Sequence, residues 1–438
     1  MKKIIKTIVP ERFILWYHYL VALFATAYYG FPGKRMVVIG VTGTKGKTSA
    51  SNFIWACLTA GGKRTGLLST ANIRIGEREL LNERHMTMPG PLTIQRLMAE
   101  MVRAGCTVCI VETTSEGLKQ YRHIGAYYDI AVFTNLFPEH LRSHGGSFEA
   151  YRKAKEKMFR ALSSHRKILN GKPVEKVIIA NADSEHASAF LQYPADKKIT
   201  YGVRSQSAEY AARDIKEETD GVRFTVSGAP FRLAIPGIFN ALNALPAIII
   251  GRLLGVDDTA IACGLSALTV IPGRMEKIDV GQNFTVFVDY AHEKESMTRA
   301  LEAVNAMKRA GARTIVLLGA EGGGRDTAKR PAMGERAGAL ADYVIVSNVD
   351  PYDDDPKTIL EDIARASEQT GKVRERDLFV IEDRREGIAK AFALAKSGDT
   401  VLLTGKGAEQ SMIIGEKRLA WDDRMVAREE LAKLPAHR

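Results

Sequence analysis

Residues 36–60 read MVVIGVTGTKGKTSASNFIWACLTA, the pattern of a strand, a glycine-rich loop and a helix. Residues 36–41 are apolar and β-branched, as in a buried parallel strand, and residues 48–60 are expected to form a helix. Glycines let a loop backbone approach phosphate oxygens, and the free N–H groups at a helix N-terminus point at the anion. The segment therefore predicts a site for the phosphates of ATP.

The loop between strand and helix supplies the side chains that such a site needs. Lys47 is placed to reach the β- and γ-phosphates, and the Thr48 hydroxyl is placed to bind Mg²⁺. Val41 stands where the strict pattern G-x-x-x-x-G-K-[ST] has its first glycine. The alternative is a chance glycine-rich turn, which the flanking strand and helix disfavour. The residues predicted to contact the nucleotide are Thr42, Gly43, Thr44, Lys45, Gly46, Lys47 and Thr48.

The length and charge of the chain limit the kinds of molecule that it is expected to bind. The chain has 438 residues, enough for about two or three domains, and carries 62 Lys and Arg against 51 Asp and Glu. No dense run of basic residues indicates nucleic acid, and the net charge of +11 also suits small anions such as nucleotides. Cys106 and Cys109 have C-x-x-C spacing but lie in an apolar run that reads as a buried strand.

The N-terminus carries an apolar segment, FILWYHYLVALFATAYYGF at residues 13–31, with no formal charge. A helix that is apolar on all sides is either buried in protein or in lipid. Three alternatives follow: a helix docked on the body or a partner, contact with the inner face of a membrane, or a signal peptide that ends at Ala25-Thr26-Ala27. Export would separate the chain from ATP, so the sequence favours a cytoplasmic location. Cationic residues flank the segment at Lys2, Lys3, Lys6, Arg12, Lys34 and Arg35.

Three parts are predicted along the chain: the apolar segment 1–35, a central ATP-binding domain 36–271 and a C-terminal domain 272–438. In the central domain, short apolar runs at 66–69, 107–112, 130–135 and 177–181 alternate with amphipathic stretches such as 92–104. This alternation predicts an α/β domain with a parallel sheet. Residues 199–235 are expected to form antiparallel strands, and residues 240–254 a helix.

Beyond residues 271–273, the alternation restarts and predicts a second, doubly wound (Rossmann-like) domain. Ligands of such a domain gather at the carboxyl ends of its strands. Polar or glycine-rich clusters stand at these ends, in residues 289–292, 322–326, 350–351 and 405–407. The expected strands are 285–290, 314–319, 343–347, 378–381 and 400–404, and the expected helices are near 295–310, 331–341, 357–369 and 384–397.

Further short motifs follow the loop: TMPGPL at 87–92, TNLFPEH at 134–140, AYRKAKEKMF at 150–159, FNALNA at 239–244, PGRME at 272–276, VDYAH at 288–292, RDTAKRPAM at 325–333 and GKGAE at 405–409. In this order they resemble the Mur ligases, the ATP-dependent amide-bond-forming enzymes of peptidoglycan synthesis, and most closely their tripeptide synthetase (MurE-type) branch. The resemblance implies a cytoplasmic ligase that adds an amino acid to a UDP-N-acetylmuramoyl peptide through an acyl phosphate.

The same resemblance assigns residues to the metal and the nucleotide. It implies two Mg²⁺ ions, held by Glu112, His140 and a carbamylated Lys155 together with Thr48, with Lys47 on the transferring phosphoryl group. Without the resemblance, Lys153, Lys155 and Lys157 would be interpreted as the solvated face of a helix. The remaining residues implied to bind the nucleotide are Asn240, Arg274 and Asp289.

For the muramoyl substrate, the resemblance points to Thr87, Thr114, Gln120 and Arg122. For the incoming amino acid, it points to Arg325, Asp350, Gly405 and Glu409.

The chain departs from the family pattern in three places, of which the replacement of two motif histidines by Glu116 and Ala408 matters least. Only 35 residues precede the central domain, where the family carries a domain for the uridine nucleotide, so UDP binding is in doubt. Tyr352 stands where the diaminopimelate-selecting element D-N-P-R has its arginine, so meso-diaminopimelate is not supported. The acidic run 353–355 favours either a basic amino acid or a helix N-cap. The rival functions are a folylpolyglutamate or poly-γ-glutamate synthetase and a membrane-tethered, non-catalytic nucleotide-binding scaffold.

Overall fold

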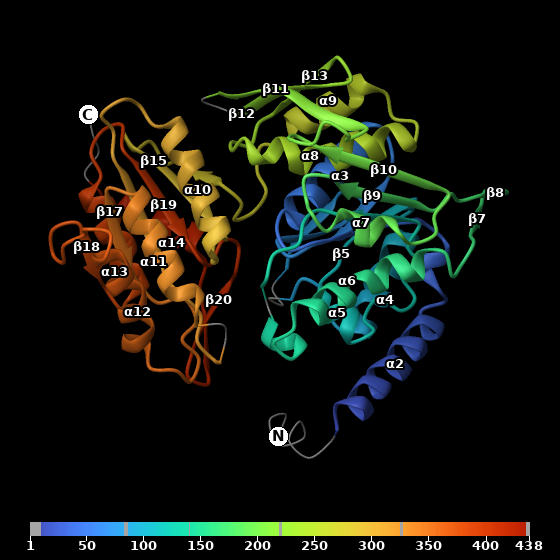
Figure 1. Cartoon of the computed structure of the whole chain (residues 1–438), viewed down its shortest axis with the longest axis horizontal. Helices are drawn as coiled ribbons and strands as arrows, with labels where there is room; N and C mark the ends of the chain where they lie inside the picture. The colour runs from blue at the N-terminus through green and yellow to red at the C-terminus, as the bar shows by residue number, and fades with distance from the viewer. Residues whose placement is uncertain (1–9, 83–85, 140, 219–220, 325–326, 435–438) are drawn as a thin grey trace. The chain divides into compact units, whose positions relative to one another are not determined.

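The structure is a computed structural model that describes residues 10–82, 86–139, 141–218, 221–324 and 327–434. The chain folds into two compact units. In Figure 1 the chain is coloured by residue number, from blue at the N-terminus to red at the C-terminus. Unit 1 consists of Met1–Ile215, Phe224–Arg232 and Asn240–Leu268. Unit 2 consists of Lys216–Arg223, Leu233–Phe239 and Thr269–Arg438.

The centre of unit 1 is a parallel sheet with strand order β10-β9-β6-β1-β5-β2, the middle of an 11-stranded sheet. Every residue of β5 and β6 is buried, as expected for strands that are covered on both faces. The strands are β1 (Val37–Thr42), β2 (Thr65–Leu68), β5 (Val108–Glu112), β6 (Ile130–Phe133), β9 (Val177–Asn181) and β10 (Lys197–Gly202).

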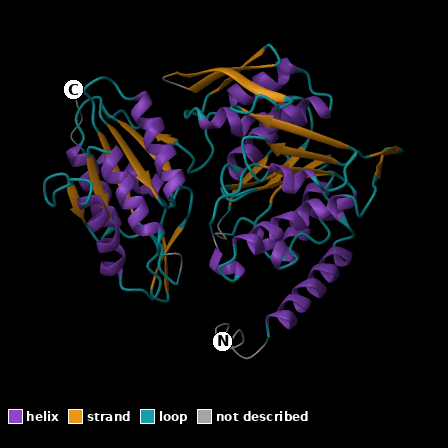
Figure 2. Ribbon diagram, viewed as in Figure 1, coloured by secondary structure: helices purple, strands orange, loops and turns teal. Residues whose placement is uncertain are grey.

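Helices cover both faces of this sheet (Figure 2). The helix α3 (Lys47–Ala60) packs against β1, β2 and β5 and against α9 (Asp258–Ala267). The other face is covered by α4 (Pro91–Arg103) and α6 (Phe148–Leu162), whose buried residues recur every three or four positions, as in amphipathic helices. Further helices follow along the chain: α5 (Ser115–Lys119), α7 (Ala187–Leu191) and α8 (Phe239–Leu253).

The two edges of the large sheet differ from the sequence prediction. At one edge, β3 (Asn72–Ile75) and β4 (Arg78–Leu81) add an antiparallel hairpin that was not predicted. At the other edge, antiparallel pairing throughout 199–235 is wrong, because β10 and β11 (Tyr210–Glu218) are parallel. The turn between them is held by the Asp183 carboxylate, which accepts from the N–H groups of residues 203–205 and so returns the chain beside Tyr201. The last strands there are β12 (Gly221–Val226) and β13 (Ala229–Leu233).

Unit 2 is the predicted doubly wound domain. Its sheet has the order β14-β15-β19-β16-β17-β18, and all neighbours are parallel except β14 and β15. The strands are β14 (Glu276–Ile278), β15 (Thr285–Asp289), β16 (Thr314–Leu318), β17 (Tyr343–Val346), β18 (Leu378–Val380) and β19 (Thr400–Thr404).

Two separate apolar cores lie on the two faces of the unit 2 sheet. One contains buried residues of α10 (Lys294–Met307), α11 (Lys329–Leu340) and α12 (Pro356–Glu368), and the other contains those of α13 (Arg384–Leu394) and α14 (Asp423–Ala432). A hairpin of β20 (Ser411–Ile414) and β21 (Lys417–Ala420) follows β19. The α/β fold predicted for both units is thus confirmed.

The apolar N-terminal segment forms the helix α2 (Glu11–Tyr28), which packs against α4. Only Ala22, Ala25 and Thr26 of this helix are buried within the chain, so unit 1 covers one side of it. Within the described part of the chain, no helix combines the length and the apolar character needed to cross a membrane.

Candidate active site

The loop between β1 and α3 approaches its neighbours so closely that only glycine fits at two positions. Gly43 and Gly46 have φ values of 151° and 78°. A Cβ on Gly43 would lie 2.0 Å from Thr134 Oγ1, and a Cβ on Gly46 would lie 2.3 Å from Asn243 Oδ1. Lys47 opens α3, and its Nζ donates to the Thr44 carbonyl at 2.8 Å. The loop therefore has the positive-φ glycines and the helix N-terminus expected of a phosphate-binding loop.

Because of this close approach, we expect Gly46→Ala to weaken ATP binding about tenfold or more, through left-handed backbone strain and the clash with Asn243. Gly62→Ala is a matched control, since Gly62 has a φ of 74° but a Cβ added there would have no atom within 4 Å. Titration calorimetry with ATP would compare the two variants. Equal affinities would contradict the assignment of this loop to the nucleotide.

Glu112, the last residue of β5, is the centre of a network of hydroxyl groups beside the loop. It is 1% exposed, and its two carboxylate oxygens accept from Thr48 Oγ1 at 3.0 and 3.1 Å. The N–H and hydroxyl of Thr70 donate to the same carboxylate at 2.7 and 2.9 Å. Thr70 Oγ1 also lies 2.8 Å from Thr87 Oγ1. The predicted metal residues Glu112 and Thr48 are therefore adjacent, and Thr70 is a member of the cluster that the sequence analysis missed.

Lys155 lies beneath the same loop. It is 2% exposed, and its Nζ donates to the Gly43 carbonyl at 2.7 Å. Burial lowers the pKa of Lys155 well below its ordinary value, the nearby Lys47 lowers it further, and Glu139 and Glu112 partly oppose the shift. By contrast, Lys153 is 65% exposed on the same helix. A solvated helix face is therefore wrong for Lys155 and correct for Lys153.

Residues far along the chain hold the loop in place. Asn135 Oδ1 accepts from the Lys45 N–H at 2.8 Å, and Lys45 Nζ pairs with Glu139 at 2.9 Å. The Tyr151 hydroxyl lies 3.0 Å from Thr44 Oγ1. Asn135 and Glu139 belong to the motif TNLFPEH, and Tyr151 belongs to AYRKAKEKMF. Their place in these motifs was the feature of the sequence that could have indicated their contacts with the loop.

Residues that follow β5 and β6 in the chain meet beside this site. His144 Nε2 lies 3.1 Å from Ser115 Oγ, and its ring packs edge-on against Tyr151. Partial burial lowers the pKa of His144 to about 4, and the neighbouring Lys119 and Lys155 act in the same direction. His144 is therefore neutral at physiological pH. The sequence analysis did not single it out.

The residues implied for the muramoyl substrate lie in three different settings. Thr114 is the N-cap of α5, where its side chain accepts from the Gly117 N–H at 3.1 Å. Arg122 donates to Gln120 Oε1 and to the Met88 carbonyl, each at 2.5 Å. Thr87 instead joins the Glu112 network through Thr70. Gln120 and Arg122 thus form one polar pair.

Of the two asparagines after the central sheet, the structure places Asn243 against the loop, through Gly46. The sequence analysis named Asn240, which is buried and accepts from Asn243 Nδ2 at 3.0 Å through its Oδ1. The two side chains act as a pair, so Asn240 orients Asn243.

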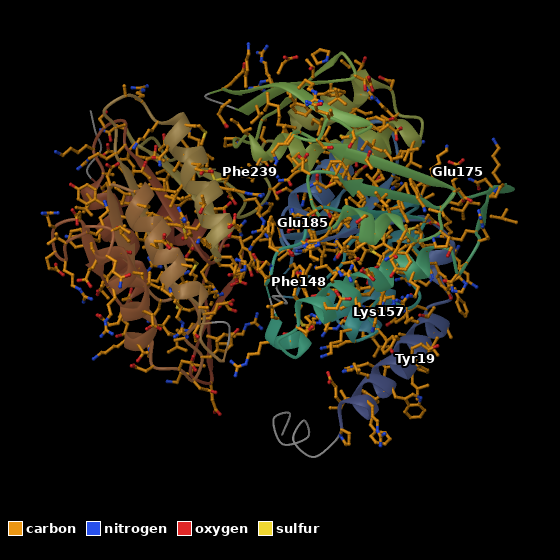
Figure 3. All side chains as sticks on the ribbon, in the orientation of Figure 1. Tyr19, Phe148, Lys157, Glu175, Glu185 and Phe239 are labelled. Atoms are coloured by element: carbon orange, nitrogen blue, oxygen red, sulfur yellow. The ribbon has the colours of Figure 1, made fainter. Side chains whose placement is uncertain are left out.

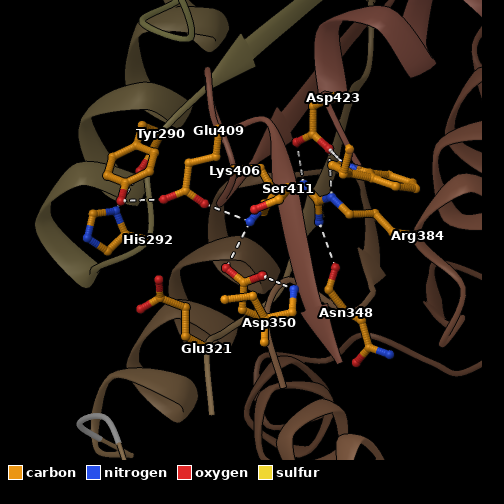
Figure 4. A network of polar contacts seen from close by, with 12 residues as sticks. Tyr290, His292, Glu321, Asn348, Asp350, Arg384, Lys406, Glu409, Ser411 and Asp423 are labelled. Atoms are coloured by element: carbon orange, nitrogen blue, oxygen red, sulfur yellow. Dashed lines mark hydrogen bonds and ion pairs between the residues drawn. The ribbon is translucent and has the colours of Figure 1, made fainter. Parts of the chain in front are cut away.

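In unit 2, a buried lysine ties together the residues implied for the amino acid (Figure 4). Lys406 has no exposed surface, and its Nζ pairs with Asp350 Oδ2 at 2.8 Å and with Glu409 Oε2 at 2.7 Å. Burial lowers the pKa of Lys406, but Glu409 and Asp350 outweigh it and raise the pKa above its ordinary value. Gly405 precedes this lysine with a φ of 106°.

The charges of this cluster predict a large effect on stability. Lys406→Met would leave Asp350 and Glu409 without their shared cation, and we expect a loss of about 3 kcal/mol in the free energy of unfolding. Lys277→Met removes an exposed pair with Asp279 and is expected to cost less than about 1 kcal/mol. Urea unfolding measures both variants. Similar losses would show that the buried cluster does not stabilise unit 2.

The nucleotide residues implied in unit 2 also have defined partners. The Asp289 carboxylate accepts from the N–H groups of Met275 and Ala291, each at 2.8 Å. The Arg274 guanidinium lies 4.5 Å from the ring centre of Tyr290, whose hydroxyl donates to Glu409 Oε1 at 3.0 Å. Burial raises the pKa of Tyr290 well above its ordinary value, with a further contribution from Glu409. Tyr290 therefore contacts Arg274 through its ring and Glu409, a partner of Lys406, through its hydroxyl.

The acidic run after Tyr352 is largely accounted for by local structure. Asp355 is the N-cap of α12 and accepts from the N–H groups of Lys357 and Thr358, and Asp354 lies 3.4 Å from Arg330. Tyr352 has a φ of 55°, and its ring lies against Gly323. The N-cap alternative is the one that the structure supports for Asp355.

Two of the implied residues, His140 and Arg325, lie outside the described residues. Among the described residues, His, Cys, Asp and Glu side chains form no group of three or more arranged to hold a metal ion. Oxygen donors are nevertheless what Mg²⁺ prefers, and the Glu112 carboxylate and the Thr48 hydroxyl supply them side by side. Cys106 and Cys109 are free, buried thiols.

The fold and the loop define a class of protein, a P-loop type nucleotide-binding enzyme with a second α/β unit. Comparison with known proteins narrows this class. Residues 41–251 match the Mur ligase middle domain, and residues 273–407 match the Mur ligase glutamate ligase domain. The chain belongs to the Mur ligase family. Members of this family are ATP-dependent, Mg²⁺-requiring ligases that form amide bonds, so the predicted class of enzyme is confirmed.

Individual relatives point to one branch of the family. The chain is 38% identical over 418 residues to the UDP-N-acetylmuramyl-tripeptide synthetase of Roseiflexus sp. (strain RS-1), covering 94% of this chain and 81% of that protein. It is 36% identical over 416 residues to a UDP-N-acetylmuramoyl-L-alanyl-D-glutamate–2,6-diaminopimelate ligase of Caldanaerobacter subterraneus, with coverages of 94% and 81%. A solved structure of a ligase of that second kind matches with a TM-score of 0.60 and 29% identity, over 91% of this chain and 78% of the other.

Proposed function

We propose that this chain couples ATP hydrolysis to the addition of an amino acid to the terminal carboxylate of a UDP-N-acetylmuramoyl peptide. The observation that carries the proposal is the cluster of Glu112, Thr48 and Lys155 around a phosphate-binding loop. The names of the relatives support this substrate class. The product would be a precursor of peptidoglycan.

The reaction has two steps. The carboxylate oxygen attacks the γ-phosphorus of ATP, the bond to the β,γ-bridging oxygen breaks, and ADP leaves. The amine of the amino acid then attacks the acyl carbon, and the tetrahedral intermediate expels phosphate while the amine loses a proton. Two anions must meet in the first step, so positioned cations contribute more than a strong base.

Each residue at the loop has a part in this scheme. Loop N–H groups and Lys47 bind the phosphates of ATP, and Lys47 neutralises charge on the transferring phosphoryl group. Thr48 and Glu112 would hold Mg²⁺, with His140 and a carbamylated Lys155 completing two ion sites by resemblance to the family. Bound Mg²⁺ supplies further neutralisation of that charge.

The environment of Lys155 supports its carbamylation. Only a neutral amine can add to CO₂, forming an N–C bond while the amine releases a proton. The lowered pKa of Lys155 increases the share of the amine that is neutral. The product carries a carboxylate in place of a buried cation, and its oxygens would suit Mg²⁺.

The amino acid is proposed to lack a second carboxylate. Asp350 and Glu409 outnumber their shared cation Lys406, and Tyr352 has no charge to offer a distal carboxylate. A neutral or basic side chain would meet no such repulsion. Glu409 is proposed to bind the α-ammonium group, and the location is proposed to be cytoplasmic, where ATP is available.

Trapping of the acyl phosphate tests the scheme. With ATP, Mg²⁺, UDP-N-acetylmuramoyl-L-Ala-D-Glu and hydroxylamine but no amino acid, we expect a hydroxamate of the muramoyl peptide, detected by mass spectrometry. Hydroxamate would fail to form if the chain only bound ATP as a scaffold, or if its acceptor were a folate or a polyglutamate.

A further inference from the structure

The helix α2 is attached to unit 1 by its smallest side chains. Ala22, Ala25 and Thr26 are buried, and Thr26 Oγ1 lies 3.5 Å from the carbonyl of Ile124. The approach is so close that a Cβ on Gly125 would lie 2.0 Å from Thr26 Oγ1. This close contact between Thr26 and Gly125 fixes which side of the helix faces unit 1.

The opposite side of α2 is apolar and exposed. Trp16 is 62% exposed, Phe24 61% and Tyr28 69%. Tyr19, labelled on α2 in Figure 3, is not part of this side, because its ring lies edge-on to that of Tyr121 with 5.4 Å between the ring centres. In a helix of 3.6 residues per turn, the exposed apolar residues fall on one side, opposite Ala22 and Ala25. This aromatic face consists of Phe13, Trp16, Tyr17, Leu20, Leu23, Phe24 and Tyr28.

The charges around the aromatic face are cationic. The acidic residue of the helix, Glu11, is paired with Lys119 at 2.6 Å. Arg12 at one end of the helix and Lys34 and Arg35 beyond the other end are exposed. In the sequence, Lys2, Lys3 and Lys6 precede them, while residues 13–31 contain no formal charge.

We propose that the aromatic face of α2 binds the surface of a phospholipid bilayer that contains anionic lipids, with the helix lying along the membrane plane. Trp, Tyr and Phe favour the region between headgroups and acyl chains, and cations beside them attract anionic headgroups. The inner side of α2 is occupied by unit 1, so only the outer side can enter the interface. Because the residues that flank the aromatic face are cationic, we expect it to bind an anionic lipid surface. Binding to a second copy of this chain is disfavoured, because the two copies carry the same charge and repel each other. The proposal does not depend on the ligase reaction.

Vesicle binding by the full chain tests this proposal. We expect co-sedimentation with vesicles of phosphatidylcholine and phosphatidylglycerol, weaker binding to phosphatidylcholine alone, and a decrease with added salt. The double variant Trp16→Ser/Phe24→Ser is expected to bind at least tenfold more weakly. Ile168→Ser is the matched control, because Ile168 is 72% exposed but lies in β7 (Ile168–Leu169). ATP binding by each variant reports that unit 1 remains folded.

Three results would overturn the proposal. One is failure of the full chain to bind either kind of vesicle, and another is equal binding by the double variant and the unaltered protein. The third is a dimer in solution that the double variant converts to a monomer, without vesicle binding by either form, since that would make a second copy the occupant. Equal binding to both kinds of vesicle would remove the anionic lipid from the proposal.

Discussion

Lys155→Ala is expected to reduce phosphate release about a thousandfold or more while leaving ATP binding nearly unchanged. The side chain is buried beneath the loop and donates to the Gly43 carbonyl, so a carbamate formed on it would lie beside the loop. Removing one preorganised charged group from a dry site costs about 10²- to 10³-fold in rate, and the loss of a metal-binding group adds to this. Steady-state phosphate release and titration calorimetry with ATP measure the two effects.

Two controls make this result specific. Lys153→Ala changes the same helix at a position 65% exposed and is expected to keep full activity. Lys155→Met preserves the packing of the long side chain and is expected to be as inactive as the alanine variant. Rescue of Lys155→Ala by a short-chain carboxylic acid would support the carbamate. Full activity of either Lys155 variant would remove Lys155 from the mechanism.

Glu112→Gln is expected to lower the rate about 10²- to 10³-fold, with little loss of stability. The amide keeps an acceptor for Thr48 and Thr70 in a side chain of the same shape, but the negative charge that would hold Mg²⁺ is lost. The defect should therefore diminish as the Mg²⁺ concentration is raised. The measurement is phosphate release as a function of Mg²⁺ concentration.

A purely structural role for Glu112 would give a different pattern. Thr70→Val is the comparison, because it removes a hydrogen bond to Glu112 without changing charge. We expect this variant to lose about 1 kcal/mol of stability and to keep its Mg²⁺ dependence. If Glu112→Gln and Thr70→Val gave the same loss and the same Mg²⁺ dependence, Glu112 would not be a metal residue.

The architecture could be predicted because it depends on local patterns. Alternating apolar runs and amphipathic stretches indicated both α/β units, and the loop at 42–48 lay at the predicted strand-to-helix junction. The prediction failed where distant contacts decide the structure. The β10–β11 pair is parallel because Asp183 turns the chain, and no periodicity in 199–210 reports that contact.

The residues of the candidate site also divide into those that the sequence indicated and those whose placement depends on distant contacts. The resemblance to the family implied that Glu112 and Thr48 share a metal, and the two side chains are in hydrogen-bond contact. Thr70 could not be predicted, because it follows β2 in a loop whose sequence has no distinctive pattern. Lys155 is buried although its neighbours at 153 and 157 suggest a solvated face, and only the motif indicated otherwise. Lys406 stood in a predicted cluster, but its burial between two carboxylates depends on the packing of β19 and the following hairpin.

The most direct test of the central claim is the product formed from ATP, Mg²⁺, UDP-N-acetylmuramoyl-L-Ala-D-Glu and each amino acid in turn. Phosphate release and mass spectrometry of the product would be measured together. We predict release of one phosphate for each tripeptide formed, with a neutral or basic amino acid and not with meso-diaminopimelate. Absence of any tripeptide from protein that still binds ATP would contradict the proposed reaction, and efficient addition of meso-diaminopimelate would contradict the role given to Tyr352.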